Sequence, residues 1–366
     1  MVLVPPAFFL HFKSEFVINE AWTDALGNAF GMGQSDAVTL GDKCGYEGFA
    51  LVLIHRNKHS KQWNNFCLAL GFKQKPKRAD GSYDGSDATV ASLFEEVMEM
   101  FGTTAKKSIA TLRTDRAALG LGPALLDRET PACDMHDGDK LGQSAIGKLI
   151  RRDMTQPIDP ATGHRPFANE FAKGVALLNK IYALGRHFAT GSRHSVLMTL
   201  GQTMKLDFPL IRMKMPKNGT RVAAIFNLVA SQARLNKVVK LYDVTRSSEF
   251  LSKLEWEEHS EVEAVLGVSR LTTTLSQYEK PFMGSFGSMI KQMTMKTLRH
   301  DNFEVIDYDA ITSSPRLTRV AKPLVDFTAL GQEVVERMRL EAERRFCGNT
   351  GEDVDGSSEV VMARSE

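Results

Sequence analysis

Basic side chains gather in three stretches of the sequence, and these residues are the best suited by type and spacing to do chemistry. Residues 56–78 hold seven Lys or Arg and no acid, and residues 205–246 hold nine bases against two acids. Residues 279–299 add four bases against one acid. Such runs bind phosphate groups in some proteins and are ordinary solvated helix faces in others.

A basic loop that leads into a helix favours phosphate binding over a solvated face. Arg212, Lys214 and Lys217 surround a Pro-Lys-Asn-Gly turn, and Arg221 follows at the expected start of a helix. The free backbone N–H groups at a helix start add their own affinity for anions. We therefore expect these four side chains to contact phosphates.

A second group of bases recurs at a spacing of three within the same helix. Arg234, Lys237 and Lys240 are expected to lie along one helical stripe. A stripe of this kind can follow a backbone whose negative charges repeat every few ångströms.

Aromatic residues alternate with bases farther along the chain. Tyr278, Phe282 and Phe286 are interleaved with Lys280 and Lys291. Rings beside cations suit stacking of bases or sugars next to phosphate contacts. Packing in a core explains the two phenylalanines equally well. The predicted RNA-contacting residues in this segment are Tyr278, Lys280, Phe286 and Lys291.

Catalytic and metal-binding patterns give little support to an enzyme. The sequence contains no P-loop, HExxH or GxSxG motif, and the glycine-rich residues 25–33 lack dinucleotide-binding spacing and are interpreted as a turn. Cys44, His55, His59 and Cys67 are the residue types that hold zinc, but their spacing matches no standard finger. We expect no catalytic residue, metal or cofactor, with zinc at these four residues left open.

The elements that must position these side chains belong to a globular chain. Of 366 residues, 43% are hydrophobic and 25% are charged, and the formal net charge is +2. No apolar run approaches the roughly twenty residues of a membrane span, and no secretory signal is visible. The four cysteines are too scattered for a disulfide framework, so we expect reduced thiols in an intracellular protein.

Hydrophobic periodicity predicts a mainly helical protein with a small β element near the N-terminus. Residues 49–54 form an apolar run that fits a strand or a short core helix, and residues 127–145 are polar and rich in turns. Helices are predicted at 87–101, 103–119, 144–154, 167–189, 195–206, 220–242, 249–266, 270–275, 286–298 and 326–346.

Three segments in order resemble one family. They are IRMKMPKNGTRVA at 211–223, YEKPFMGSFGSMI at 278–290 and DFTALGQEVVER at 326–337. The first is similar to the basic loop that precedes an RNA-facing helix in nucleoproteins of non-segmented negative-strand RNA viruses. The second resembles their central aromatic-Gly-Ser-Met region. The third resembles the Leu-Gly-Gln-Glu helix near the end of the paramyxovirus-type core. The resemblance covers roughly residues 200–347.

The resemblance implies a two-lobed, mainly helical nucleoprotein with genomic single-stranded RNA in a cleft between the lobes. It further implies homo-oligomeric helical nucleocapsids joined by terminal arms, in the virion and the host cytoplasm, with no membrane partner. The acidic end of the chain, which holds five acids and one arginine after residue 347, would recruit a viral polymerase cofactor or compete for the groove. The expected parts are an N-terminal arm (1–20), an N-terminal lobe (21–208), a C-terminal lobe (209–325), a C-terminal helix or arm (326–347) and a disordered acidic tail (348–366).

Two other classes of protein remain open on the sequence. One is a coat or capsid protein of another RNA virus, or a replication-associated nucleic-acid-binding protein. The other, less favoured because no catalytic motif is legible, is an enzyme.

Overall fold

A computed structural model gives the fold of most of the chain. It describes residues 31–39, 45–56, 63–100, 104–109, 111–113, 120–127, 133–150, 156–160, 164–167, 170–204, 213, 215, 221–246, 250–276, 285–309, 317–347 and 361–362. The chain divides into two compact units, residues 1–136 with 278–284 (unit 1) and residues 137–277 with 285–366 (unit 2).

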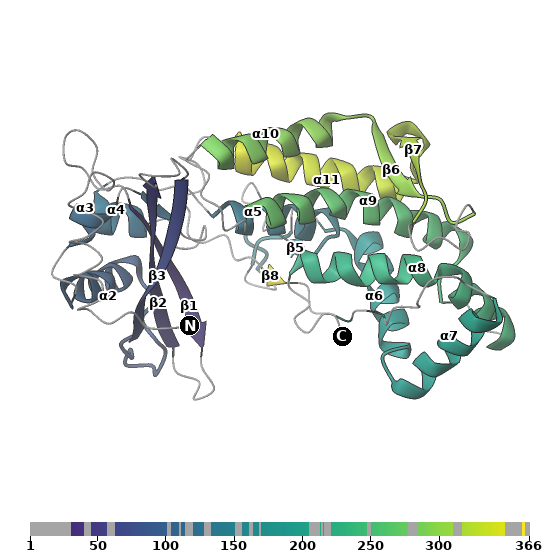
Figure 1. Ribbon diagram of the computed structural model, residues 1–366, viewed down its shortest axis with the longest axis horizontal. Coiled ribbons are helices and arrows are strands. Elements are labelled where there is room, and N and C mark those ends of the chain that lie inside the picture. Colours follow the sequence, from purple (N-terminus) through teal and green to yellow (C-terminus); the bar gives the residue numbers. More distant parts are fainter. Residues whose placement is uncertain are drawn as a thin grey trace. The chain divides into compact units, whose positions relative to one another are not determined.

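Unit 1 is built on a four-stranded sheet with helices on one face (Figure 1). The strands are β1 (Gly31–Thr39), β2 (Gly45–Arg56), β3 (Trp63–Gln74) and β4 (Thr111–Arg113), and the helices are α2 (Asp87–Met100), α3 (Ala105–Ser108) and α4 (Leu121–Leu126). The order across the sheet is β3-β2-β1-β4; β2 is antiparallel to both β1 and β3, and β4 runs parallel to β1.

The core of unit 1 lies between this sheet and α2. Phe49 of β2 stacks on Phe94 of α2 with ring centroids 4.8 Å apart, and both side chains are fully buried. Gly33 of β1 lies so close to this core that a Cβ would come within 2.9 Å of Ile109 and Leu112. The end of the glycine-rich segment is therefore a packed strand and not a turn.

Unit 2 is mainly helical. Its helices are α5 (Asp134–Ala145, from Asp137 onward in this unit), α6 (Ala172–His187), α7 (Gly191–Thr203), α8 (Val222–Arg246), α9 (Lys253–Ser276), α10 (Ser285–Arg299) and α11 (Ala329–Phe346), with a 3-10 turn, η3 (Leu324–Asp326), before α11. Its strands are β6 (Asn302–Ile306) and β7 (Arg319–Pro323), which form an antiparallel hairpin, and β5 (Leu149–Ile150) and β8 (Val361–Met362), which pair antiparallel.

Helices α8 and α9 form the centre of unit 2. Apolar side chains on several sides of α8 are buried, because α5, α6, α7 and α9 all pack around it. A polar chain is buried between α8, α9 and the end of β6: His259 Nδ1 lies 2.8 Å from the Tyr308 hydroxyl, and His259 Nε2 lies 3.3 Å from Gln232 Oε1. Complete burial of the imidazole lowers the pKa of His259 to about 3.

Two glycines let α5 approach its neighbours closely. A Cβ on Gly138 would lie 3.0 Å from Thr273 Oγ1, and a Cβ on Gly142 would lie 2.5 Å from Val222. The Ser269 hydroxyl of α9 donates to the Gly138 carbonyl at 2.5 Å. The polar sequence of α5 thus belongs to a buried helix.

The prediction of a mainly helical protein with a small β element near the N-terminus is confirmed. Helices α2, α6, α7, α8, α10 and α11 lie within a few residues of their predicted ranges, and the two helices predicted at 249–266 and 270–275 form the single helix α9. The run at 49–54 is a strand. Within the described residues, no helix combines the length and hydropathy that crossing a bilayer requires.

Three secondary-structure predictions are wrong. In the described part of the helix predicted at 103–119, α3 is followed by β4, because Thr111–Arg113 pairs with β1. The turn-rich region at 127–145 contains α5, and the described part of the helix predicted at 144–154 instead has a turn at Gly147 (φ 75°) and then β5. The β6–β7 hairpin was not predicted.

The compact units also divide the chain at a different place from the predicted lobes. The division falls after His136 and not after residue 208, because α6 and α7 pack with α8 in one core. In the same core, α11 buries Val334, Val335 and Met338 completely, so the predicted C-terminal arm is an integral helix of unit 2. Within the predicted acidic tail, Val361 and Met362 form β8.

Candidate nucleic-acid interface

A basic groove lies between α10 and the end of α11. It has a cavity volume of about 690 Å³, and we call it the α10 groove. Its lining residues are Ser288, Lys291, Gln292, Met295, Lys296, Arg299, His300, Phe346 and Cys347. Among the described lining residues there is no carboxylate, and the cationic side chains are Lys291, Lys296 and Arg299, with His300 beside them.

One face of α10 lines the α10 groove. Ser288, Gln292, Met295 and Arg299 recur at spacings of four, three and four, which places them on one face of α10. Lys296 and Arg299 are exposed, and neither forms an ion pair with any residue that the structure describes. Their full charge is therefore available to an anion.

Among the described residues that line this groove, Lys291 is the one that was predicted to contact RNA. It is half-buried, and its Nζ lies 5.6 Å from the centroid of the Phe346 ring, a cation–π distance. The predicted stretch at 279–299 contains Lys296 and Arg299, although neither was singled out as a site residue. Phe346 was not predicted either, because a single apolar residue at the end of a helix carries no signal of a groove.

The predicted cations of α8 lie apart from this lining. Arg221, Arg234 and Lys240 are exposed and Lys237 is half-buried, and none of the four lines the α10 groove. The Lys240 ammonium lies over the Tyr308 ring at 5.8 Å. Arg234, Lys237 and Lys240 lie on successive turns of the single helix α8, and their role as a phosphate-binding stripe stays a prediction.

The start of α8 is already occupied by a carboxylate of this chain. The backbone N–H of Val222 donates to Asp139 Oδ1 at 2.7 Å, and the Val222 side chain is completely buried against α5. The prediction that this helix start adds anion affinity is therefore wrong for this N–H group. Asp139 of α5 takes the place that a phosphate would need.

Several predicted site residues lie outside the described residues. They are Arg212, Lys214, Lys217, Tyr278 and Lys280. Phe286 lies in α10, but its side chain is outside the described part. The predicted N-terminal arm at 1–20 is also outside it.

Three bases of the first basic stretch form ion pairs among the described residues of unit 1. Lys73, Lys75 and Arg78 form ion pairs with Glu96, Glu47 and Asp84 at 3.0, 2.7 and 2.7 Å. Lys77 lies over the Tyr83 ring at 5.6 Å. These contacts tie β3 and the loop after it to their neighbours, a structural role.

Three acidic residues of α9 form ion pairs with two cations of β7. Lys322 Nζ lies 2.7 Å from both Glu257 and Glu261, and Arg319 lies 2.7 Å from Glu263. Burial lowers the pKa of Lys322, but its hydrogen bonds to the two glutamates outweigh the burial and raise the pKa overall. The β6–β7 hairpin is thereby held on α9.

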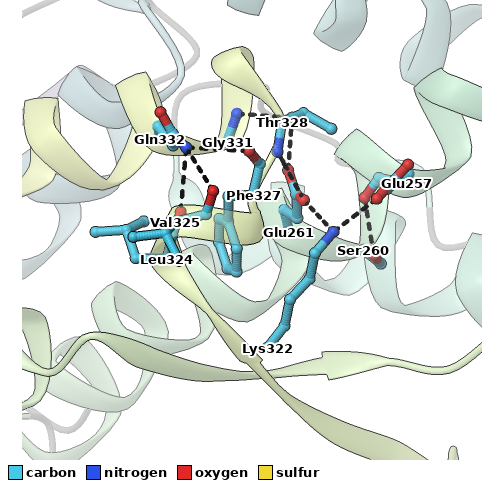
Figure 2. Close-up of polar contacts among 10 residues, drawn as sticks. All are labelled: Glu257, Ser260, Glu261, Lys322, Leu324, Val325, Phe327, Thr328, Gly331 and Gln332. Atoms are coloured by element: carbon cyan, nitrogen blue, oxygen red, sulfur yellow. Dashed lines mark hydrogen bonds and ion pairs between the residues drawn. The ribbon is translucent and has the colours of Figure 1, made fainter.

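The Leu-Gly-Gln-Glu segment has a structural role at the start of α11 (Figure 2). The buried Glu261 carboxylate accepts from the Thr328 N–H at 3.0 Å and from the Thr328 hydroxyl at 2.6 Å. A Cβ on Gly331 would lie 2.1 Å from Glu261 Oε2, so only glycine fits. Gln332 Nε2 reaches the carbonyls of η3 and Phe327, including Leu324 at 3.2 Å.

The four side chains of the possible zinc site lie outside the described part of the structure. His55 lies in β2 and Cys67 in β3, with their side chains outside the described part, as are Cys44 and His59. No group of three or more metal-ligating side chains occurs elsewhere among the residues that the structure describes.

No model of a known protein family matches the chain, and no curated protein is significantly similar to it in sequence.

Proposed function

We propose that this protein is a viral nucleoprotein that coats single-stranded genomic RNA without sequence preference. The observation that carries the proposal is the α10 groove, in which Lys296 and Arg299 have no ionic partner among the described residues. A protein that must bind any sequence should contact phosphate and sugar and should not read base edges.

The exposed cations of α8 support the same proposal. Arg221, Arg234 and Lys240 add positive charge to unit 2, and three acids of α9 are paired with cations of β7. The basic loop with Arg212, Lys214 and Lys217 is proposed to extend this surface. The resemblance of residues 200–347 to nucleoproteins supplies the remaining parts of the proposal: helical self-assembly, and a location in the virion nucleocapsid and the host cytoplasm.

Charge reversal in the groove tests the proposal directly. The double variant K296E/R299E should lower affinity for a single-stranded RNA oligonucleotide by about tenfold or more at low salt, and equally for unrelated sequences. The control K173E/K253E makes the same change in net charge on α6 and α9, away from the groove. Unchanged binding in the groove variant, or equal losses in both variants, would contradict the proposal.

The basic loop is tested by reversing Lys214, Lys217 and Arg221 together. Wild-type protein purified at low salt should carry RNA, measured by its absorbance ratio, and the triple variant should not. Electron microscopy of the RNA-loaded protein should show filaments or rings. Closed shells would instead favour a coat protein.

A further inference from the structure

The α10 groove contains an aromatic ring beside its cations. Phe346 is the last residue of α11, and its side chain packs partly against the core of unit 2 while it also lines the groove. The Cys347 N–H donates to the Glu343 carbonyl at 2.9 Å, which holds the backbone at this helix end. Contact with the core of unit 2 therefore positions the ring beside the groove.

The cations extend along α10 from the side of this ring. Lys291 lies over Phe346, whereas Arg299 is eight residues farther on, which is about 12 Å along a helix that rises 1.5 Å per residue. A small anion would need only two neighbouring cations. A row of cations with a ring at one end matches a chain that presents both phosphates and flat bases.

We propose that Phe346 stacks an unpaired base while Lys296 and Arg299 bind the adjoining phosphates. The α10 groove is then selective for single-stranded nucleic acid over polyanions that have no bases, and over duplexes, whose bases are already stacked on each other. This inference rests on the proposed function, since it concerns the same groove, and it names the chemical feature of the ligand that the groove recognises.

The test compares two ligands that differ only in their bases. Protein stripped of nucleic acid is titrated with a labelled 12-nucleotide oligo(A) and with an abasic oligonucleotide of the same length and charge. Wild-type protein should bind oligo(A) about tenfold more tightly, within the range found for stacking of one base on one aromatic ring. The variant F346L should bring this ratio close to one.

Tyrosine and leucine at position 346 separate stacking from packing. F346Y keeps the ring and should keep the wild-type ratio, whereas F346L keeps apolar volume against the core and lacks the ring. A wild-type ratio in F346L, or a ratio near one in the wild type, would overturn the stacking role. The result for K296E/R299E is separate: if that variant binds both ligands normally, the proposed function itself fails.

A photochemical measurement keeps the inference testable if F346L folds poorly. Wild-type protein bound to an oligonucleotide that contains 4-thiouridine is irradiated and digested, and the crosslinked peptides are identified by mass spectrometry. The expected product includes the peptide that carries Phe346. Efficient crosslinking that is confined to other peptides would overturn the inference.

Discussion

The buried Glu261 carboxylate should be a sensitive point of unit 2. It is fully buried, and it accepts from the backbone and hydroxyl of Thr328 and from Lys322. E261A would leave all three donors without this acceptor. Removal of one partner from a buried ion pair costs about 3–5 kcal/mol, and we expect about 3 kcal/mol because Lys322 keeps its contact with Glu257.

A second substitution, at Gly331, tests whether the cost of E261A comes from the observed contact between Glu261 and the start of α11. In the wild-type background, G331A would push a methyl group into Glu261 and should cost about 2 kcal/mol. In the E261A background the carboxylate is gone and the nearest remaining side chain is Phe327, whose Cδ2 lies 3.0 Å from the position of the new Cβ, so G331A should cost less there. The two substitutions should therefore be non-additive by about 1–2 kcal/mol.

Urea denaturation followed by circular dichroism measures each free energy of unfolding. E261A should also lower the midpoint of thermal unfolding by roughly 6–12 °C for a unit of this size. The matched control is G191A, because a Cβ on Gly191 in α7 meets nothing within 4 Å and its substitution should be nearly neutral. Additive effects of E261A and G331A, within about 0.5 kcal/mol, would refute the reasoning.

Three further predictions concern pH, a buried ion pair and salt. The pKa of His259 is depressed to about 3, so the unfolded state takes up a proton that the folded state does not, and stability should fall below pH 6.5 by about 2 kcal/mol at pH 5. This loss should be missing from the pH dependence of H259Q, measured by urea denaturation. R345M should cost about 3–5 kcal/mol, because it leaves the buried carboxylate of Asp137 without the guanidinium 2.6 Å away; a double variant with D137N should recover part of the loss. The slope of log affinity for RNA against log salt should become shallower by about 1.4 in K296E/R299E, and an unchanged slope would exclude both side chains from phosphate contact.

Helices with strong apolar periodicity could be predicted from the sequence. In α2, Val90, Leu93, Phe94, Val97 and Met98 recur at spacings of three and four, and all five are buried. Helix α8 could be located for a different reason: its apolar residues lie on several sides, and residues 222–246 contain neither Gly nor Pro.

Elements held by distant contacts could not be predicted. Helix α5 is polar and contains Gly138 and Gly142, which usually indicate a loop. Here both glycines are needed because Thr273 and Val222 approach α5 closely, and these partners lie more than 75 positions away in the sequence. Strand β4 likewise depends on pairing with β1, about 80 residues earlier.

The candidate site was predicted only in part, for the same reason. A cluster of Lys and Arg indicates positive charge but does not show which cations are already paired within the fold. Only the structure shows that Lys75 and Lys322 are bound to glutamates, whereas Lys296 and Arg299 are not. The sequence also showed no sign that Asp139, 83 residues earlier, accepts a hydrogen bond from the backbone N–H at the start of α8.

The ion pairs between β7 and α9 change the local electrostatic potential of unit 2. A reader of the sequence sees an acidic helix between two basic segments and expects it to repel nucleic acid. In the folded chain, Arg319 and Lys322 form ion pairs with Glu257, Glu261 and Glu263 and offset most of their negative charge locally. These pairs leave the net charge of unit 2 unchanged, but they make the local negative potential around α9 weaker than a map of charge along the sequence suggests.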